Sequence, residues 1–568
     1  MLKSQYESTM AKLLFIGVPF TSLFLLTGTV TDPVNVTKFL ALGGVGFAAL
    51  SLFLIRGFKF GASISGTALI LAGLFVIFSF ISILMSDSPL PQNLYGLFGR
   101  NTGFLTYLFL VGLLLGALTL QKIDSFKKIY LGLFFTGVIN VFYCGWVVFF
   151  GDFVGWNNPY GNILGLFGNP NFIGAFLGIW ISATVGYLLG AAMPIWQRIS
   201  IVLLLVLSLY EVYKSHAVQG VVVTAAGVAT VGFFFIRSRT KGWVLVSLYS
   251  GTVISFGFVA LAGALQKGPL AEIVYKTSVS LRGSYWNAGI QTALNHPLTG
   301  VGMDGYGDWY RRSRSLNAAT VMPGPNTVTN SAHNVVIDIF SYGGFPLLLS
   351  YLGLLLLGAF AIFRGLKRTR TYDPIFVALS VAWIGYQLQS LISINQIGLA
   401  VWGWVLTGAL IAYDASQKMD KSSLSDKTEN KKTKPGAQNK SEVISSPLIA
   451  GLGLTVGLIL ACPPISADMA WVKAMKTGNF AEVEKVLQPS YLHPRSSERL
   501  ANAAGILENS KLYDQAHKYA LIATEFNPNN FEAWYILYAI KNSSENERAL
   551  ALENMKRLDP LNPDVTKR

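Results

Sequence analysis

The sequence is poor in charge. Asp, Glu, Lys and Arg make up 13% of the 568 residues, about half the share expected of a soluble domain. Hydrophobic residues make up 52%, and the mean hydropathy is +0.47. This composition excludes a soluble enzyme and indicates a protein that crosses a membrane many times.

Cysteine is nearly absent as well. The two cysteines, Cys144 and Cys462, lie in separate apolar runs. A disulfide framework and a cysteine-based metal site are therefore both excluded as organising features.

Negative charge is also in short supply, which leaves a formal net charge of +15. In a soluble protein this excess would suggest nucleic acid as a partner. Here the basic residues fall mainly in short loops between apolar runs, so we interpret them as topology signals and expect no nucleic-acid partner.

Long apolar runs recur along the chain, each near the ~20 residues that a bilayer requires. They predict an all-α polytopic membrane protein with about thirteen transmembrane helices, one large outer loop and a C-terminal α-helical repeat domain. The predicted spans are 12–30, 38–55, 66–85, 103–120, 129–151, 172–192, 199–213, 218–236, 242–263, 344–363, 375–393, 397–413 and 446–463.

Lys and Arg predict the orientation. If the N-terminus lies in the cytoplasm, every basic cluster that closely flanks a span falls on the cytoplasmic side, as the positive-inside rule requires. These clusters are Arg56 and Lys59; Lys122, Lys127 and Lys128; Arg198; Arg237, Arg239 and Lys241; and Arg364, Lys367, Arg368 and Arg370. The loop 264–333 and the C-terminal tail then both lie outside.

Composition divides the chain into four parts. Residues 1–413 form the multi-span domain with the outer loop 264–333, and residues 414–445 form a lysine-bearing linker that we expect to be disordered in the cytoplasm. Residues 446–463 form the last span, and residues 464–568 form an extracytoplasmic domain.

The tail resembles tetratricopeptide repeats. Trp471 with Pro489, and Trp534 with Pro560, bracket similar predicted helix pairs, and Ala516 lies in a middle pair. A generic domain of helical hairpins is the alternative. In either case stacked helix pairs make an extended surface on which a protein partner could dock.

The outer arginines break the topology rule and so need another explanation. Arg100, Arg282, Arg311, Arg312 and Arg314 are all predicted to lie outside. Arginine binds phosphate through a planar, bidentate fork, so a cluster at the membrane surface suits a lipid-linked phosphate or diphosphate. The alternative is a set of solvated loop charges, and we expect Arg314 to be one of these.

His333 lies where the outer loop re-enters an apolar helix, directly before Asn334. A neutral imidazole at this place could accept a proton near pH 7. The alternative is a histidine that only caps the helix or contacts lipid headgroups.

These residues form a pattern. Arg282 and Trp286 precede His296-Pro297-Leu298-Thr299-Gly300-Val301-Gly302, and Ala332-His333-Asn334 stands before a glycine-bearing helix. Gly168-Asn169-Pro170-Asn171-Phe172 begins an earlier helix. The pattern, over roughly residues 10–413, resembles the O-antigen ligase and O-antigen polymerase family.

The resemblance implies a membrane fold of the C-type glycosyltransferase kind, in the bacterial cytoplasmic membrane. Such enzymes move a glycan from an undecaprenyl-diphosphate carrier to a glycan, lipid or protein acceptor on the outer face, with inversion and with no metal or other cofactor. By position, His333 would be the base and Arg282 the main phosphate arginine. Arg100, Trp286 and Asn334 would contact the substrate.

Two departures from the family pattern concern the phosphate site and the helix after His333. Relatives often carry Ser-Arg-Gly near a mid-chain helix, whereas this chain has Lys214-Ser215-His216. Lys214 or His216 could supply the missing charge, or Arg311 and Arg312 could do so from the loop. After His333 the chain has Gly343-Gly344-Phe345-Pro346 instead of Gly-x-x-Gly, so the helix could break differently.

Three functions compete at this point. The leading one is a glycosyltransferase, either a ligase or a polymerase. A flippase of lipid-linked glycan would place ionisable residues within its helices, which are nearly free of charge here. A non-catalytic scaffold would have no need of His333 at the re-entry point.

Overall fold

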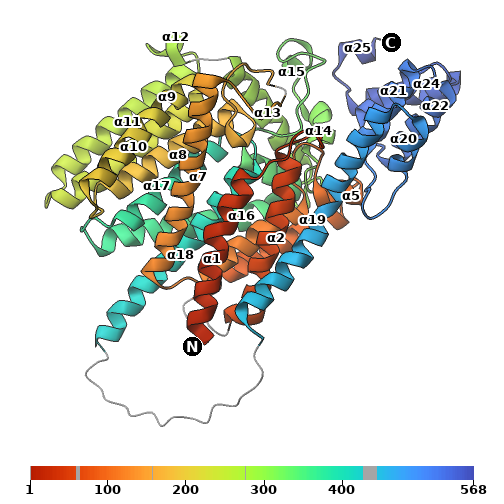
Figure 1. Ribbon diagram of the computed structural model, residues 1–568. Coiled ribbons are helices and arrows are strands. Elements are labelled where there is room, and N and C mark those ends of the chain that lie inside the picture. Colours follow the sequence, from red (N-terminus) through yellow and green to blue (C-terminus); the bar gives the residue numbers. More distant parts are fainter. Residues whose placement is uncertain (1, 59–63, 157, 275–276, 426–443, 568) are drawn as a thin grey trace.

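The computed structural model describes residues 2–58, 64–156, 158–274, 277–425 and 444–567. Over these residues the chain is helical, with no strand (Figure 1). This agrees with the predicted all-α class, and it suits lipid because a helix satisfies all its backbone hydrogen bonds internally.

Within these described ranges, ten helices are long and apolar enough to cross a membrane. They are α2 with η1 (Asn35–Gly57), α4 (Gly66–Leu84), α7 (Ile123–Phe150), α8 (Pro170–Leu188), α9 (Ile195–Lys214), α10 (Val218–Arg239), α11 (Val244–Ala264), α16 (Val335–Arg368), α18 (Ile397–Ser425) and α19 (Ser446–Thr477). The other three predicted spans fall on α1 (Leu2–Leu23), α6 (Phe104–Leu118) and α17 (Pro374–Ser390). The expected count of thirteen stays a prediction.

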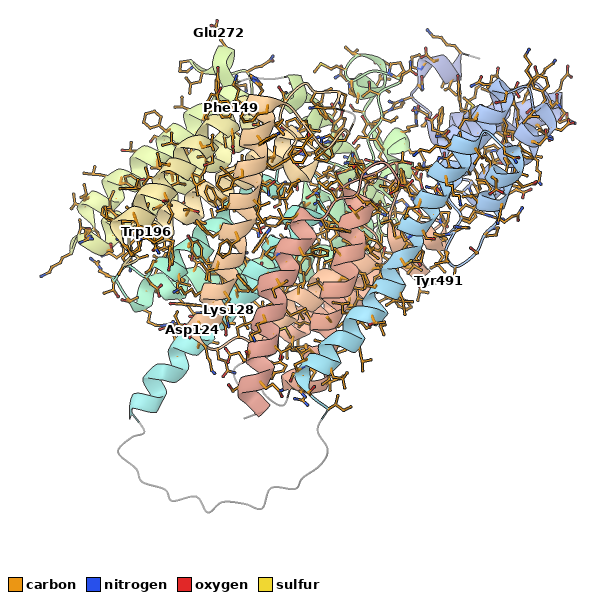
Figure 2. The ribbon with its side chains drawn as sticks, viewed as in Figure 1. Asp124, Lys128, Phe149, Trp196, Glu272 and Tyr491 are labelled. Carbon is orange, nitrogen blue, oxygen red and sulfur yellow. The ribbon has the colours of Figure 1, made fainter. Side chains whose placement is uncertain are left out.

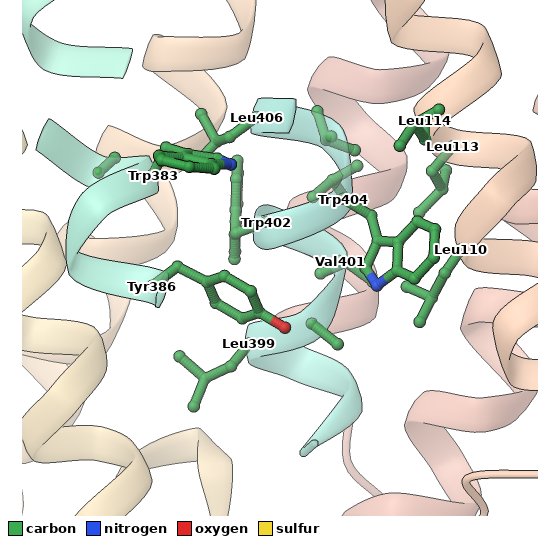
Figure 3. Close-up of a cluster of buried hydrophobic side chains, with 14 of the residues drawn as sticks. Leu110, Leu113, Leu114, Trp383, Tyr386, Leu399, Val401, Trp402, Trp404 and Leu406 are labelled. Carbon is green, nitrogen blue, oxygen red and sulfur yellow. The ribbon is translucent and has the colours of Figure 1, made fainter. Parts of the chain in front are cut away.

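The centre of the bundle is α18, which packs against α6 and α17 (Figure 3). Trp402 and Trp404 of α18 are buried, and Trp402 Nε1 donates to Ser22 Oγ at 2.9 Å. On α17, Trp383 Nε1 donates to Thr407 Oγ1 at 2.9 Å. Each indole thus buries its ring and still satisfies its N–H, which fixes the register of these helices.

The last span is an integral part of the bundle, since α19 packs closely on α2. A Cβ atom at Gly457 would stand 2.0 Å from the carbonyl oxygen of Gly43, and one at Gly43 would stand 2.3 Å from Ala461 Cβ. Small residues at such a crossing let two backbones approach in lipid.

The helix α18 corrects the predicted start of the linker. It continues past residue 413 to Ser425, because Asp414 forms ion pairs with Arg364, Arg368 and Lys418 that hold this turn in place. The part of the linker at 426–443 lies outside the described residues.

The tail begins as a direct extension of the last span, since α19 runs through the predicted boundary at 463 to Thr477. Beyond it come α20 (Phe480–Leu487), α21 (Ser497–Asn509), α22 (Tyr513–Phe526), α23 (Phe531–Ala539), α24 (Glu545–Leu558) and α25 (Pro563–Thr566). These helices pack around their own core, which includes Ala504, Tyr519 and Met555. Their assignment to the tetratricopeptide class stays a prediction.

The outer loop and the tail lie at the same end of the bundle, opposite the N-terminus (Figure 1). Within the loop are α12 (Ala271–Val274), α13 (Thr277–Asn295), α14 (Tyr306–Ser313) and α15 (Leu316–Thr320). Glu272 of α12 marks this end, and Lys128 of α7 lies toward the other (Figure 2). The two segments predicted to share a side therefore do so.

The helix α16 is broken near its start. Gly344 has φ +64°, and Pro346 has no N–H to donate to the Tyr342 carbonyl one turn back. The freed carbonyls are satisfied from outside the helix: Val301 N–H donates to Ser341 at 3.0 Å, and Gly302 N–H donates to Tyr342 at 3.2 Å.

The contact of residues 300–302 with the broken start of α16 explains the glycines in the sequence motif 296–302. A Cβ atom at Gly302 would lie 2.2 Å from Ser86 Oγ, and one at Gly300 would lie 2.2 Å from the Tyr342 oxygen. The backbone can only reach the broken helix where both side chains are absent. The segment Gly300–Gly302 thus joins the loop to α16 and to Ser86, in the turn after α4.

Candidate functional site

His333 lies in a tight turn between the loop and α16. Its backbone has φ +56°, its N–H donates to Ser331 Oγ at 3.0 Å, and its ring Nδ1 lies 3.2 Å from the Ser331 carbonyl oxygen. Because a carbonyl can only accept, Nδ1 carries the proton of the neutral ring. Nε2 then has a free lone pair, which is the form required of a base.

Asp338 holds this turn. One carboxylate oxygen accepts from Ser331 Oγ at 2.7 Å, and the other accepts from Ala332 N–H at 2.7 Å. Since Ser331 in turn contacts both the backbone and the ring of His333, Asp338 orients the imidazole through one intermediate residue. A third group that orients the base is the usual arrangement in proton-transfer sites.

Asn334 has a structural role, and its predicted contact with the substrate stays a prediction. Its Oδ1 caps α16 by accepting from Val336 N–H at 3.0 Å and Ile337 N–H at 3.2 Å, and its Nδ2 donates to the Leu391 carbonyl at 2.9 Å. Both polar ends of the side chain are thus engaged within the protein. Since Asn334 is the cap, the alternative that His333 caps the helix is wrong.

The helix α13 covers the other side of His333. The ring of Tyr285 packs on the imidazole with centroids 5.5 Å apart. Arg282 lies almost one turn earlier on the same helix and is half-buried. Beside them the buried Trp286 Nε1 has no hydrogen-bond partner among the described residues.

Arg100 approaches from the membrane domain. Its Nε donates to Asn330 Oδ1 at 2.9 Å. It lines a small polar cavity together with Thr102, Asp304, Asn330, Ser331, Asp338, Asn395 and Gln396. The cavity therefore brings Arg100 and the turn that carries His333 together, although more than 200 residues separate them.

The electrostatics of the site favour a neutral base and an anionic ligand. Burial is the main cause that lowers the pKa of His333 to about 4; the hydrogen bond to Ser331 raises it, and the charges of Arg100 and Arg282 lower it further. Burial also lowers the pKa of Arg282, so its charge is poorly hydrated and would gain from an anion.

Asp304 lines the same cavity as Arg100 and stabilises the site. It is buried, accepts from Leu97 N–H at 2.7 Å and from the Tyr342 hydroxyl at 3.1 Å, and burial raises its pKa. It therefore ties the turn of Arg100 to the broken helix. Among the described residues, no three His, Cys, Asp or Glu side chains are grouped so as to hold a metal ion.

The arginines of α14, Arg311 and Arg312, and the following Arg314 have partners within the protein. The substrate contacts predicted for Arg311 and Arg312 stay predictions. Arg311 donates to Asp559 at 3.0 Å and to Glu532 at 2.8 Å, both in the tail, and Arg312 stacks on Trp309 at 3.7 Å. Arg314 was expected to be solvated, but it is buried and donates to both oxygens of Asp559 at 2.7 and 2.8 Å. The ion pairs of Arg311 and Arg314 with Glu532 and Asp559 join the tail to the outer loop, and we call them the clasp.

The clasp is connected to His333 through tyrosines. On α14, the Tyr306 hydroxyl donates to the Tyr285 carbonyl at 2.8 Å, and Tyr310 packs on the Tyr285 ring at 5.8 Å. Tyr285 in turn packs on His333. The tail thus supports the surface against which the imidazole rests.

We expect Asp559→Asn to loosen the tail. The substitution leaves the buried guanidinium group of Arg314 without a carboxylate, whereas Arg311 keeps Glu532. Removal of one partner from a buried ion pair typically costs about 3–5 kcal/mol. Hydrogen exchange of α14 should rise, and glycan transfer should fall. Asp564→Asn, at an exposed carboxylate of α25, is the control. Unchanged exchange in α14 of Asp559→Asn would show that the clasp does not hold the tail.

Lys214 and His216 lie at the junction of α9 and α10. Lys214 Nζ lies over the Tyr210 ring at 5.5 Å, and the His216 ring packs near Tyr213 with centroids 6.1 Å apart. The intervening Ser215 faces Gly174 of α8. Their place in substrate binding stays a prediction.

The sequence reasoning missed Ser331, Tyr285, Asp304 and Asp338. For Asp338 a signal was available, since it is an acid in the first turn of an otherwise apolar helix, four residues after Asn334. An ionisable residue at such a place usually has a partner or a function.

Comparison with known families agrees with this geometry. A family model described as O-antigen ligase matches residues 202–352. The matched segment runs from α9 to the first half of α16 and includes Arg282 and His333. The match supports the O-antigen ligase and polymerase family, and with it glycosyl transfer from lipid-linked substrates. No curated protein matches the chain.

Proposed function

We propose that this protein transfers a glycan from an undecaprenyl-diphosphate carrier to an acceptor hydroxyl at the outer face of the bacterial cytoplasmic membrane. The observation that carries the proposal is the fixed tautomer of His333, whose Nε2 is free to accept a proton while Arg100 and Arg282 act on it from two sides. The acceptor is a glycan, a lipid or a protein.

In the proposed step, Nε2 of His333 takes the proton of the acceptor hydroxyl as its oxygen attacks the anomeric carbon. The bond from that carbon to the diphosphate oxygen breaks, and the diphosphate leaves with its electron pair. Arg282 and Arg100 stabilise the charge of the leaving group. Attack from the side opposite the diphosphate inverts the anomeric configuration.

Donor binding would tune the base. The two arginines lower the pKa of His333 in the free enzyme. A bound diphosphate offsets their charge and brings the pKa of His333 closer to neutrality, where general-base catalysis is most effective. The base would thus become strong only when the donor is in place.

A flippase is the weaker alternative. Its coupling groups should lie near mid-span, whereas Asp338 lies in the first turn of α16 and is engaged by Ser331 and Ala332. This acid fits the support of a base better than ion coupling.

The proposal predicts a specific pH dependence. Because His333 must be neutral to act, kcat/KM should stay level from pH 7 to about pH 5 and fall below it, in line with a pKa of about 4 in the free enzyme. The acid limb of kcat, which reports the donor complex, should lie at higher pH. Initial rates in vesicles check this, with His493→Asn as the control. A kcat/KM limb at 6.5 or above would contradict the assignment.

The proposal also requires the site to face outward. Reporter fusions after Lys241 and after Pro560 should report opposite sides of the membrane, the first cytoplasmic and the second external. Finding both on one side would remove the basis for an outer-face reaction.

A further inference from the structure

A groove separates the tail from the membrane domain. On the tail side it is bounded by α19, α21 and the end of α22, and on the other side by α5 (Leu90–Tyr95) and the following turn. It encloses a cavity of about 190 Å³. Four aromatic rings line it: Tyr95, Phe98, Trp471 and Phe526.

The charges of the groove are fixed and nearly balanced. Arg499 lies between the rings of Phe98 at 5.4 Å and Trp471 at 5.5 Å, and pairs with the buried Asp468 at 3.4 Å. Arg495 lies over the Phe526 ring at 5.6 Å, and Glu498 lines the same groove. A strongly charged ligand is therefore not what the groove favours.

Two polar side chains that line the groove each have an atom with no hydrogen-bond partner among the described residues. Asn101 is only 2% exposed, yet its Oδ1 accepts no hydrogen bond among the described residues. The buried Nε of Arg495 likewise donates no hydrogen bond to any of these residues. Acceptors and donors thus stand beside aromatic faces. This combination suits a sugar, whose ring carries an apolar face and a rim of hydroxyls that donate and accept.

One end of the groove adjoins the candidate active site. The turn at 97–102 places Leu97, Phe98 and Asn101 in the groove and Arg100 and Thr102 in the cavity beside Ser331. A ligand that lies along this turn would therefore stand next to Arg100.

The other end leads to the membrane. A second hollow shares Tyr95, Arg495 and Phe526 with the groove and extends it to Tyr491. The Tyr491 hydroxyl donates to the Ile459 carbonyl at 2.6 Å, within the spanning part of α19 (Figure 2). Tyrosine is favoured at the boundary between lipid and water. The groove thus extends from the membrane surface to the turn at 97–102, whose other residues line the cavity beside Ser331.

We propose that this groove binds the sugars of a membrane-anchored acceptor, with the lipid at the Tyr491 end and the reacting hydroxyl at the Arg100 end. The assignment rests on the proposed glycan transfer and names its acceptor class as a glycolipid. The C-terminal domain then has a direct part in the reaction, since it supplies one wall of the acceptor site.

Photo-crosslinking of the full-length protein tests the groove. A benzophenone amino acid replaces Phe98, which is 37% exposed, and in a control it replaces Phe256 on α11, which is 70% exposed. The protein in vesicles is irradiated with the total glycolipid extract of the cell envelope. We expect an adduct that stains for glycan at position 98 and none at 256, and a loss of at least five-fold when Trp471→Ala is added.

Each outcome decides one question. A glycan adduct at 98 that depends on Trp471 supports the groove. No glycan adduct, an equal one at 256, or an adduct with a protein alone overturns it. Trp471→Phe, which keeps an aromatic face, should retain the adduct, so loss through misfolding is recognised. The result is independent of His333: an adduct in an enzyme whose His333→Asn variant is fully active would uphold the groove and overturn the proposed mechanism.

Discussion

His333→Asn should abolish most glycan transfer and leave carrier-linked glycan to accumulate. Loss of a general base typically lowers the rate by roughly 10²–10⁴-fold. The turn holds the imidazole Nε2 lone pair in a fixed orientation, because Nδ1 is engaged by the Ser331 carbonyl. Transfer and carrier-linked glycan can both be measured in cells by gel analysis and lipid extraction.

Asparagine is the informative replacement. It tolerates the positive φ of position 333, and Asn334 caps α16 in either protein, so the fold should be kept. His493→Asn in the tail is the matched control. Near-normal transfer by His333→Asn would mean that the arginines alone drive the reaction, by stabilising the leaving group.

Arg282→Lys should lose nearly as much activity as Arg282→Ala, while the protein still inserts and accumulates. Lysine keeps the charge but loses the bidentate fork that matches a phosphate. Removal of one donor to a developing oxyanion typically lowers kcat by about 10²–10³-fold. Initial rates with a lipid-diphosphate donor measure the effect.

Arg239→Lys, at the C-terminal end of α10 and away from Lys214 and His216, is the control for handling and expression. If Arg282→Ala transferred glycan at the normal rate, the diphosphate would have to bind elsewhere. Lys214 and His216 at the start of α10 would then be the next residues to test.

The sequence predicted the elements of the fold well, because a span has a local signature. All thirteen predicted spans fall on helices, including α9, whose apolar run was the shortest. Helix ends were harder, since they depend on distant partners. Asp414 extends α18 through ion pairs with two arginines of α16, and no local pattern shows this.

The site was predicted in part. His333 and Arg282 stood out because a titratable group and an outward arginine are costly near lipid and so need a reason. Arg100, also predicted from the sequence as a substrate contact, lines the cavity beside Ser331. Arg314 was misjudged because its partner, Asp559, lies 245 residues away. Asn334 caps α16, and whether it also contacts the substrate stays a prediction.

The broken helix shows the same limit. Gly343, Gly344 and Pro346 signal a break in the sequence, but not what satisfies the freed carbonyls. The backbone of Val301 and Gly302 does so, and this places the loop over α16. A motif that looks catalytic in the sequence is thus partly a device for attaching the loop.

A single-turnover reaction tests the central claim most directly. Purified full-length protein in vesicles is mixed with excess acceptor and a limiting undecaprenyl-diphosphate-linked glycan, in the presence of a chelator. We predict one undecaprenyl diphosphate released for each glycan transferred by the wild-type protein, with inverted anomeric configuration, and almost none by His333→Asn. Equal transfer by the two proteins, or retention of configuration, would contradict the account.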